Sequence, residues 1–293
     1  MSDLSIVITS FNRPLLLTRA VQSVLDNAGQ IEIEVIVVDD ASSEPLPSFR
    51  DEKVKVLRME KNGGPGPARM RGIRAAKAPW VMILDDDDVV KPGAFSILSR
   101  ALRGQDYSSC SVIQFARSNG SLEGCFRVVK LSDYLNGKIK GDFTPVFNRS
   151  NFLGTGLSYP DNRAGGEHIL WWELAKEYNG IPSFSDVLVL TLEDAESRLT
   201  NVSSQIRKAE DHYQLAQATL NRFGEILKKD FPQEYRRVCL GRITYGLLSG
   251  RRKEAREHLS EMPNCGAIRA VLWVITWAPL FLVKALFRLY RQR

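Results

Sequence analysis

The chain has 293 residues, of which 44% are hydrophobic and 25% charged, with a formal net charge of +6. This composition is ordinary for a globular protein with a sizeable core. The four cysteines are scattered without a C-x-x-C spacing, so they imply neither a zinc site nor a disulfide framework.

The charge is concentrated at the C-terminus. Between Arg251 and Arg293 there are nine Lys or Arg and three Glu, which leaves the rest of the chain close to neutral. A basic, apolar C-terminus favours a membrane surface over nucleic acid as a partner. The N-terminus lacks a basic segment followed by a long apolar run, so we expect no signal peptide and a cytoplasmic protein.

The first hundred residues alternate between strand-like and helix-like segments. Strands are expected at residues 4–9, 33–38, 54–57 and 80–84. The alternation predicts an α/β fold with a doubly wound, mostly parallel sheet. Ligands bind at the carboxyl ends of strands in such sheets, so Asp39-Asp40 and Asp85–Asp88 should share a crevice.

The run W-V-M-I-L-D-D-D-D-V-V ends a predicted strand in four carboxylates. Adjacent anions repel one another, so the fold needs a positive group beside them. Hard oxygen donors suit Mg²⁺ or Mn²⁺, and a divalent cation with a phosphorylated ligand is one candidate. The alternative is an acidic turn that caps the next helix near Pro92.

The middle of the chain is less regular and the end is helical. Strands are expected at 111–116, 126–131 and 187–192, with a short β-prone run within 144–152, a loop at 153–167 and a helix from Glu167. Helices follow at 206–226, 233–248 and 252–262. We predict three parts: a first domain at 1–201, a helical extension at 202–266, and a membrane-associated apolar and basic helix at 267–293.

The last part contains the apolar stretch Ala270–Val283, followed by a basic tail. The stretch is shorter than the ~20 residues of a membrane span, and Pro279 interrupts it. We therefore expect an interfacial helix, with Trp273 and Trp277 at headgroup depth and the tail on anionic lipid. The alternative is a buried helix docked on the body of the protein.

Four motifs occur in order: V-I-T-S-F-N-R-P, V-V-D-D-A-S, N-G-G-P-G-P-A-R-M-R-G-I and I-L-D-D-D-D. Together they resemble glycosyltransferase family 2, the inverting nucleotide-sugar transferases of GT-A fold, in its bacterial cell-surface polysaccharide type. The resemblance covers about residues 4–200. It implies a nucleotide-sugar donor and a divalent metal, Mn²⁺ or Mg²⁺.

The resemblance also implies roles for individual residues in donor binding. The positions it assigns to the nucleotide sugar are Thr9, Phe11, Asn12, Arg13, Asp39, Asp40, Gly64, Arg69, Asp85, Asp86 and Arg198. Asp39 as a turn cap and Arg69 as a solvated cation are the alternatives. Met70 stands where the family usually has Asn.

The acidic run falls on the family's D-x-D motif. The resemblance implies that Asp87 ligates the metal and that Asp85 reaches the ribose or the metal shell. Asp86 and Asp88 are less defined, and one of them could cap the following helix. Arg198 matches a position near the diphosphate.

An inverting transfer needs a general base on the acceptor hydroxyl. The family places a Glu-Asp pair at the start of a helix, and the matching segment of this sequence is G-G-E-H. Glu167 matches the Glu, whereas His168 stands where Asp is usual. Both residue types accept protons. We favour Glu167 as the base, with His168 close by or sharing the role.

The sequence thus predicts a metal-dependent inverting glycosyltransferase on the inner face of the cell membrane. We expect its acceptor to be a glycan that is linked to polyprenyl diphosphate and used in surface polysaccharide synthesis. The alternative is a non-catalytic scaffold of a polysaccharide assembly complex. This alternative is favoured by His168, which stands where the family usually has Asp. A nucleotidyltransferase is disfavoured because S-F-N-R-P has no glycine-rich loop.

Overall fold

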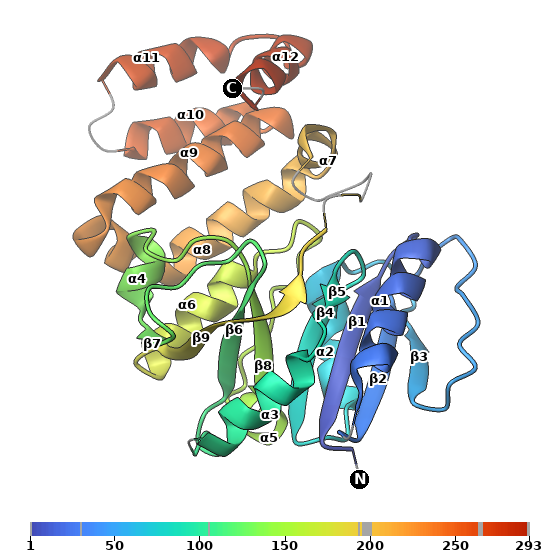
Figure 1. Ribbon diagram of the computed structural model, residues 1–293. Helices are drawn as coiled ribbons and strands as arrows, with labels where there is room; N and C mark the ends of the chain where they lie inside the picture. Colours follow the sequence, from blue (N-terminus) through green and yellow to red (C-terminus); the bar gives the residue numbers. More distant parts are fainter. Residues whose placement is uncertain are drawn as a thin grey trace. The chain divides into compact units, whose positions relative to one another are not determined.

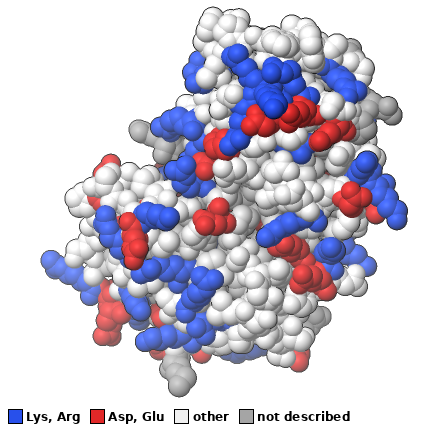
Figure 2. Space-filling model, turned by 180° about the vertical axis from the view of Figure 1, so that it is seen from behind, with Lys and Arg blue, Asp and Glu red and all other residues white. Residues whose placement is uncertain are grey.

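A computed structural model describes residues 2–29, 31–104, 106–192, 194, 201–262 and 266–291. Contacts divide the chain into two compact units. The first comprises Met1–Asp161 with Gly165–Ala195, and the second comprises Asn162–Ala164 with Glu196–Arg293. The first unit contains the sheet and the second is helical (Figure 1). Acidic and basic side chains are interspersed over the face seen in Figure 2.

The sheet of the first unit has the strand order β3-β2-β1-β4-β8-β6-β9-β5, with β7 paired to β9. Its strands are β1 (Leu4–Ser10), β2 (Ile33–Asp39), β3 (Val54–Arg58), β4 (Trp80–Asp85), β5 (Val89–Val90), β6 (Val112–Arg117), β7 (Phe126–Val129), β8 (Phe143–Asn148) and β9 (Ile181–Leu190). Strands β1 to β4 are parallel, whereas β8 runs antiparallel to β4 and β6. The predicted doubly wound α/β sheet is confirmed.

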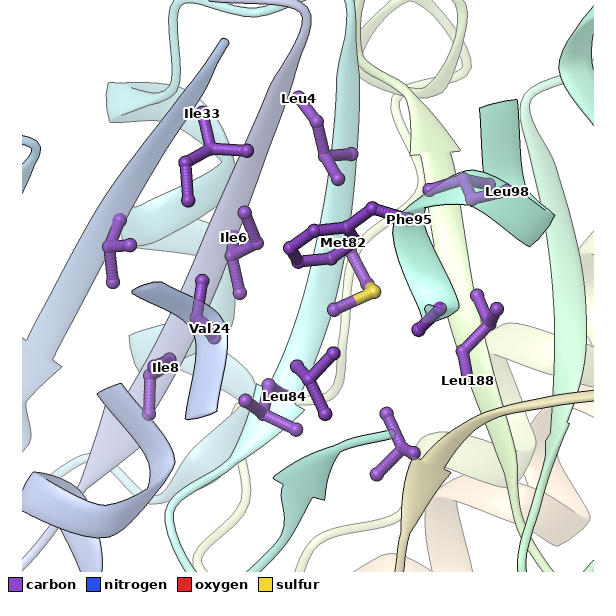
Figure 3. Packing of buried hydrophobic residues seen from close by; sticks show 14 of the residues in the cluster. Leu4, Ile6, Ile8, Val24, Ile33, Met82, Leu84, Phe95, Leu98 and Leu188 are labelled. Atoms are coloured by element: carbon purple, nitrogen blue, oxygen red, sulfur yellow. The ribbon is translucent and has the colours of Figure 1, made fainter. Parts of the chain in front are cut away.

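Helices pack on both faces of this sheet. Alternate residues of each buried strand point to opposite faces, so Ile6 and Ile8 belong to one hydrophobic cluster and Val7 to the other. On the first face the sheet packs against α1 (Pro14–Asn27) and α3 (Ala94–Gly104). Figure 3 shows Val24 of α1 and Phe95 of α3 over these strands. On the second face lie α2 (Pro65–Ala75) and α6 (Glu167–Glu177).

The register of the parallel strands aligns their carboxyl ends. Ser10 lies opposite Asp39, and Thr9 lies opposite Asp85. The acidic ends of β2 and β4 therefore flank the end of β1 on its two sides. The Ser10 hydroxyl donates a 2.6 Å hydrogen bond to Asp86, which links the strand ends directly. Both acidic segments thus lie at the same edge of the sheet, and their sharing of one crevice stays a prediction.

One expectation for the middle of the chain is confirmed, and one has the wrong start. The short β-prone run expected within 144–152 is β8, which ends at Asn148, where the Asn148 side chain accepts the backbone N–H of Asn151 and begins α5 (Arg149–Gly154). The strand expected from residue 187 begins at Ile181, because its first half pairs with β7 and β6. A short helix, α4 (Leu131–Leu135), follows β7.

The second unit consists of helices. They are α7 (Val202–Arg207), α8 (Ala209–Asp230), α9 (Pro232–Leu248), α10 (Arg252–Glu261), α11 (Gly266–Ile275) and α12 (Leu280–Arg291). One hydrophobic cluster joins residues of α8, α9, α10 and α12. No helix among the described residues has both the length and the apolar character to cross a membrane. The predicted separation of residues 267–293 from the helices before them stays a prediction.

The single apolar helix predicted near the C-terminus is two helices. Helix α11 ends at Ile275 and α12 begins at Leu280, directly after Pro279. Proline has no N–H and disfavours a helical residue before it, so the apolar run breaks there. The alternative of a buried terminal helix is correct for one face of α12, where Val283 and Phe287 are 6% and 7% exposed.

Candidate active site

A cavity of about 440 Å³ lies in the first unit, between the sheet and α6. Its polar and charged lining side chains are Arg69, Asp85, Gln114, Arg117, Tyr134, Asp142, Tyr159, Glu167 and His168. Four predicted site residues from separate segments thus share one cavity: Arg69, Asp85, Glu167 and His168. The predicted residues of the β1 loop and of the β2 end are not among its lining residues.

Two arginines and two carboxylates dominate the cavity wall. Nη2 of Arg69 lies 2.6 Å from Oδ1 of Asp85, and Nη1 of Arg69 forms an ion pair with Glu167. Nη1 of Arg117 lies 2.7 Å from Oδ2 of Asp85 and 2.7 Å from Oδ2 of Asp88. Arg69 is buried and lies over the ring of Tyr159. The alternative of a solvated Arg69 is therefore wrong.

Arg69 and Arg117 determine the pKa shifts of the carboxylates that line the cavity. Burial alone would raise the pKa of Asp85, but the Arg117 and Arg69 guanidiniums outweigh it and hold that pKa far below its usual range. Burial also opposes ionisation of Glu167, yet the charge and hydrogen bond of Arg69 lower its pKa. Burial works against the charge of Arg69 too, but Asp85 and Glu167 raise its pKa well above the usual value. All three groups are charged near neutral pH.

Asp86 and Asp88 are less exposed than the other two carboxylates of the acidic run, Asp85 and Asp87. Asp86 accepts hydrogen bonds from Ser10 and from Nη1 of Arg13, and Asp88 accepts from Arg117 and from the backbone N–H of Leu192. Burial raises the pKa of Asp86 to about 6 and that of Asp88 to about 7. These contacts lie within the site and not at the start of α3, so the helix-cap alternative is wrong for both.

The loop after β1 is oriented by its own polar contacts. Asn12 has a φ of 54°, and its side-chain oxygen accepts the backbone N–H of Ser43 at 2.8 Å. Phe11 is 43% exposed beside it. Nη1 of Arg13 lies 2.8 Å from Asp86 and 3.3 Å from Asp87. The contacts predicted for Thr9, Phe11, Asn12 and Arg13 with a nucleotide stay predictions.

The carboxylates at the end of β2 hold neighbouring backbone. Asp39 is fully buried and accepts the backbone N–H of Ser42 at 3.0 Å, so its turn-capping alternative is confirmed. Asp40 accepts the backbone N–H groups of Gly63 and Gly64, each at 2.8 Å. Gly64 has a φ of 88°, which favours glycine, and it starts α2. Asp40 thereby holds the glycine-rich segment against the strand end.

Glu167 and His168 stand at the first turn of α6, after the left-handed Gly166. Both side chains line the cavity. The His168 ring contacts Trp172 edge-on, with the ring centroids 5.0 Å apart. Trp172 is buried, whereas Trp171 lines the cavity.

Residues 5–140 match the family model described as Glycosyl transferase family 2. The matched residues, 5–140, thus carry a glycosyltransferase family 2 domain. Curated relatives agree with this match. The chain is 37% identical over 94 residues to the succinoglycan biosynthesis protein ExoO of Rhizobium meliloti, covering 31% of this chain and 27% of that protein. It is 30% identical over 192 residues to the GalNAc(5)-diNAcBac-PP-undecaprenol beta-1,3-glucosyltransferase of Campylobacter jejuni, covering 60% of this chain and 61% of that protein.

Solved structures share the fold of the family 2 domain. S. aureus TarS 1-349 in complex with UDP-GlcNAc superposes with a TM-score of 0.57 at 16% identity, covering 99% of this chain and 92% of that one. The mannosyltransferase PcManGT from Pyrobaculum calidifontis, in complex with GDP-Man and Mn²⁺, gives 0.55 at 13% identity, with 100% and 88% covered. At these sequence identities the likeness shows a shared fold and nothing beyond it.

One carboxylate of the acidic run is less engaged with guanidinium groups than Asp85. The Asp87 carboxylate is contacted, among the described residues, by Arg13 at 3.3 Å, and it is 19% exposed. Asp85 differs because both of its oxygens lie within 2.7 Å of a guanidinium nitrogen. Within the described part of the chain, no three His, Cys, Asp or Glu side chains are grouped to hold a metal unaided. Arg198 lies outside the described residues.

Sequence reasoning missed Arg117, Gln114 and Tyr134. Arg117 ends β6, and Gln114 is buried within that strand, where its side-chain nitrogen donates to the Tyr134 hydroxyl at 2.9 Å. The run V-I-Q-F-A-R does carry a signal, since a polar residue and a charged end interrupt an otherwise apolar buried strand. That signal could have identified β6 as the opposite wall of the site.

Proposed function

We propose that the protein is a metal-dependent inverting glycosyltransferase that moves a sugar from a nucleotide-sugar donor to a glycan acceptor in surface polysaccharide synthesis. One observation carries the proposal. The cavity joins Asp85, at the start of the acidic run on β4, to Glu167 and His168 on α6. An inverting transfer needs this arrangement, with the leaving diphosphate on one side of the reacting carbon and a base on the other.

The donor belongs beside the acidic run. Asp87 would hold the divalent metal, because its carboxylate is less engaged than those of its neighbours. When bound, that ion supplies Lewis-acid stabilisation of the departing diphosphate. The structural relatives in complex with UDP-GlcNAc and with GDP-Man and Mn²⁺ support a donor of this class. Arg69 and Arg117 place two guanidinium groups in the adjacent wall, and Asp85 holds both in place.

We assign the general base to His168 rather than to Glu167. The Arg69 ion pair occupies an oxygen of Glu167 and lowers its pKa, so that carboxylate is a poor proton acceptor. Imidazole is the side chain whose ordinary pKa lies closest to pH 7, and His168 lines the cavity beside Glu167. In this assignment His168 takes the proton of the acceptor hydroxyl. Glu167 acts as a positioning residue that fixes Arg69 against Asp85.

The acceptor in this proposal is a polyprenyl-diphosphate-linked glycan at the inner face of the cell membrane. Two observations support it. The Campylobacter jejuni relative carries a PP-undecaprenol-linked acceptor in its name. The C-terminal helices α11 and α12 of this chain expose large apolar side chains.

The test is release of nucleoside diphosphate from a panel of UDP-, GDP- and dTDP-sugars, with Mn²⁺ and lipid-linked acceptors. With the active donor, His168→Ala should lower kcat by about 10²- to 10⁴-fold, the range typical of a lost general base. Glu167→Gln should lower kcat less, because the uncharged amide still accepts a hydrogen bond from Arg69. His258→Ala in the helical unit is the matched control and should leave kcat unchanged. Full turnover by His168→Ala would remove His168 from the mechanism.

A further inference from the structure

The outer surface of α11 and α12 is unusually apolar. Among the described residues, sixteen large hydrophobic side chains are exposed, and ten of them lie between Ile268 and Tyr290. They are Ile268, Val271, Trp273, Val274, Trp277, Phe281, Leu282, Leu286, Leu289 and Tyr290. Scattered exposed hydrophobics are normal on a protein surface, but a contiguous group marks an interaction site. We call this group the hairpin surface.

The hairpin surface is distinct from the face by which the two helices pack on their own unit. Leu272 and Ile275 of α11, and Val283 and Phe287 of α12, face the hydrophobic cluster of the helical unit. The exposed side chains lie on the remaining faces of the same helices, so both helices are apolar on more than their core side. A helix that is apolar around most of its circumference needs cover on its outer side as well.

The charged residues of α11 and α12 themselves have one sign. The sequence from Met262 to Arg293 contains no Asp or Glu. Lys284, Arg288 and Arg291 follow one another at helical spacing along α12, and Arg256 of α10 lies over the Trp277 ring. Figure 2 shows a largely white surface at one end of the helical unit, with blue side chains along its border. The cover must therefore be apolar where it meets the helices and anionic at its edge.

We propose that α11 and α12 lie in the interface of an anionic lipid bilayer, with the hairpin surface inserted into one leaflet. Helices of 10 and 12 residues are about 15 and 18 Å long, well short of the ~30 Å hydrocarbon core, and Pro279 separates them. Trp273 and Trp277 suit the headgroup depth, and the basic side chains of α12 suit lipid phosphates. This inference adds to the proposed function the surface that would bring the enzyme to a lipid-linked acceptor, but its test uses neither donor nor acceptor.

The first test is flotation of the full chain with vesicles of phosphatidylcholine, alone or mixed with phosphatidylglycerol. The chain should float with the mixed vesicles, and Phe281→Asp with Leu289→Asp should abolish flotation. Both positions are exposed, at 69% and 62%, so the fold should survive, which far-UV circular dichroism checks. The control pair is Val56→Asp with Val128→Asp, which removes two exposed apolar residues of the sheet unit and should float like the native chain.

The second test removes charge and leaves the apolar residues intact. Arg288→Gln with Arg291→Gln should weaken binding to the mixed vesicles by about fivefold per charge, or roughly 25-fold together. Lys228→Gln with Lys229→Gln removes the same charge from the exposed end of α8 and should change binding little. Equal loss in both pairs would contradict the assignment of the basic edge to α12.

Three results would overturn the proposal. The first is failure of the native chain to float with phosphatidylglycerol vesicles, and the second is unchanged flotation after the two aspartate substitutions. The third is a stable dimer in sedimentation without lipid that Phe281→Asp with Leu289→Asp dissociates, because a second copy would then cover the surface. Failure of the glycosyltransferase proposal would appear separately, as absence of nucleoside diphosphate release by a chain that still floats.

Discussion

Replacing Arg117 by methionine should be the most damaging single change in the cavity wall. The side chain is 10% exposed, and its Nη1 atom lies 2.7 Å from both Asp85 and Asp88. Methionine preserves much of the volume but leaves the two carboxylates with one guanidinium fewer. Asp85 keeps its contact with Arg69, whereas Asp88 retains the weaker backbone contact with Leu192.

The expected loss of unfolding free energy follows from that difference. Removing one partner of a buried ion pair costs about 3–5 kcal/mol, because the remaining charge is left uncompensated. Asp88 can limit this loss by taking up a proton, since burial has already raised its pKa to about 7. We therefore expect the lower end, about 3 kcal/mol, for Arg117→Met. Adding Asp88→Asn should recover part of the loss because it removes the stranded charge.

Urea unfolding followed by circular dichroism measures this difference. The control is Arg237→Met, whose side chain is 70% exposed and pairs with Glu234. An exposed pair contributes about 0–1 kcal/mol, so the control should unfold close to the native midpoint. The reasoning would be refuted if Arg117→Met lost no more stability than Arg237→Met, or if Asp88→Asn failed to restore any of the loss.

Two further predictions concern the packing of α2 and the half-buried His212 of α8. A Cβ at Gly72 would lie 2.3 Å from Cγ1 of Val7, so Gly72→Ala should lower the free energy of unfolding in urea by about 1–3 kcal/mol. A Cβ at Gly224 would have no atom within 4 Å, so Gly224→Ala should instead stabilise α8 by up to about 1 kcal/mol. Equal effects of the two substitutions would contradict the close approach of α2 to β1. Burial lowers the pKa of His212 to about 4, below the ~6.5 of an unfolded histidine, so the unfolded state binds the proton more tightly and stability falls by about 2 kcal/mol between pH 7.5 and 5. His212→Phe keeps a ring against Tyr245 and should remove that dependence, and an unchanged pH profile would assign it to other groups.

The fold of the first hundred residues was predictable because its signals are local. Buried parallel strands read as apolar runs, and the prolines at the starts of α1 and α2 mark the helix entries. Since parallel strands align their ends, the shared edge of Asp39-Asp40 and Asp85–Asp88 followed from the strand assignment alone. The middle was harder because β8 runs antiparallel between β4 and β6, an order set by long-range pairing.

The roles of individual site residues were less predictable, since they depend on contacts between distant segments. Asp40 is acidic at the end of a strand, yet its oxygens accept the N–H groups of Gly63 and Gly64. Arg69 reads as a solvated or phosphate-binding cation until Asp85 and Glu167 are placed on its two sides. Those pairings span 16 and 98 residues of sequence, so no local pattern reports them.

Titration calorimetry of UDP-, GDP- and dTDP-sugars against the full chain, with and without Mn²⁺, measures directly whether the site binds a nucleotide sugar through a metal. We expect one donor class to bind with Mn²⁺, and Asp87→Asn to remove the Mn²⁺ dependence without changing the unfolding midpoint. Asp161→Asn, at an exposed position outside the cavity lining, is the matched control and should bind like the native chain. Absence of binding by every nucleotide sugar, with and without Mn²⁺, would contradict the account and favour a non-catalytic scaffold.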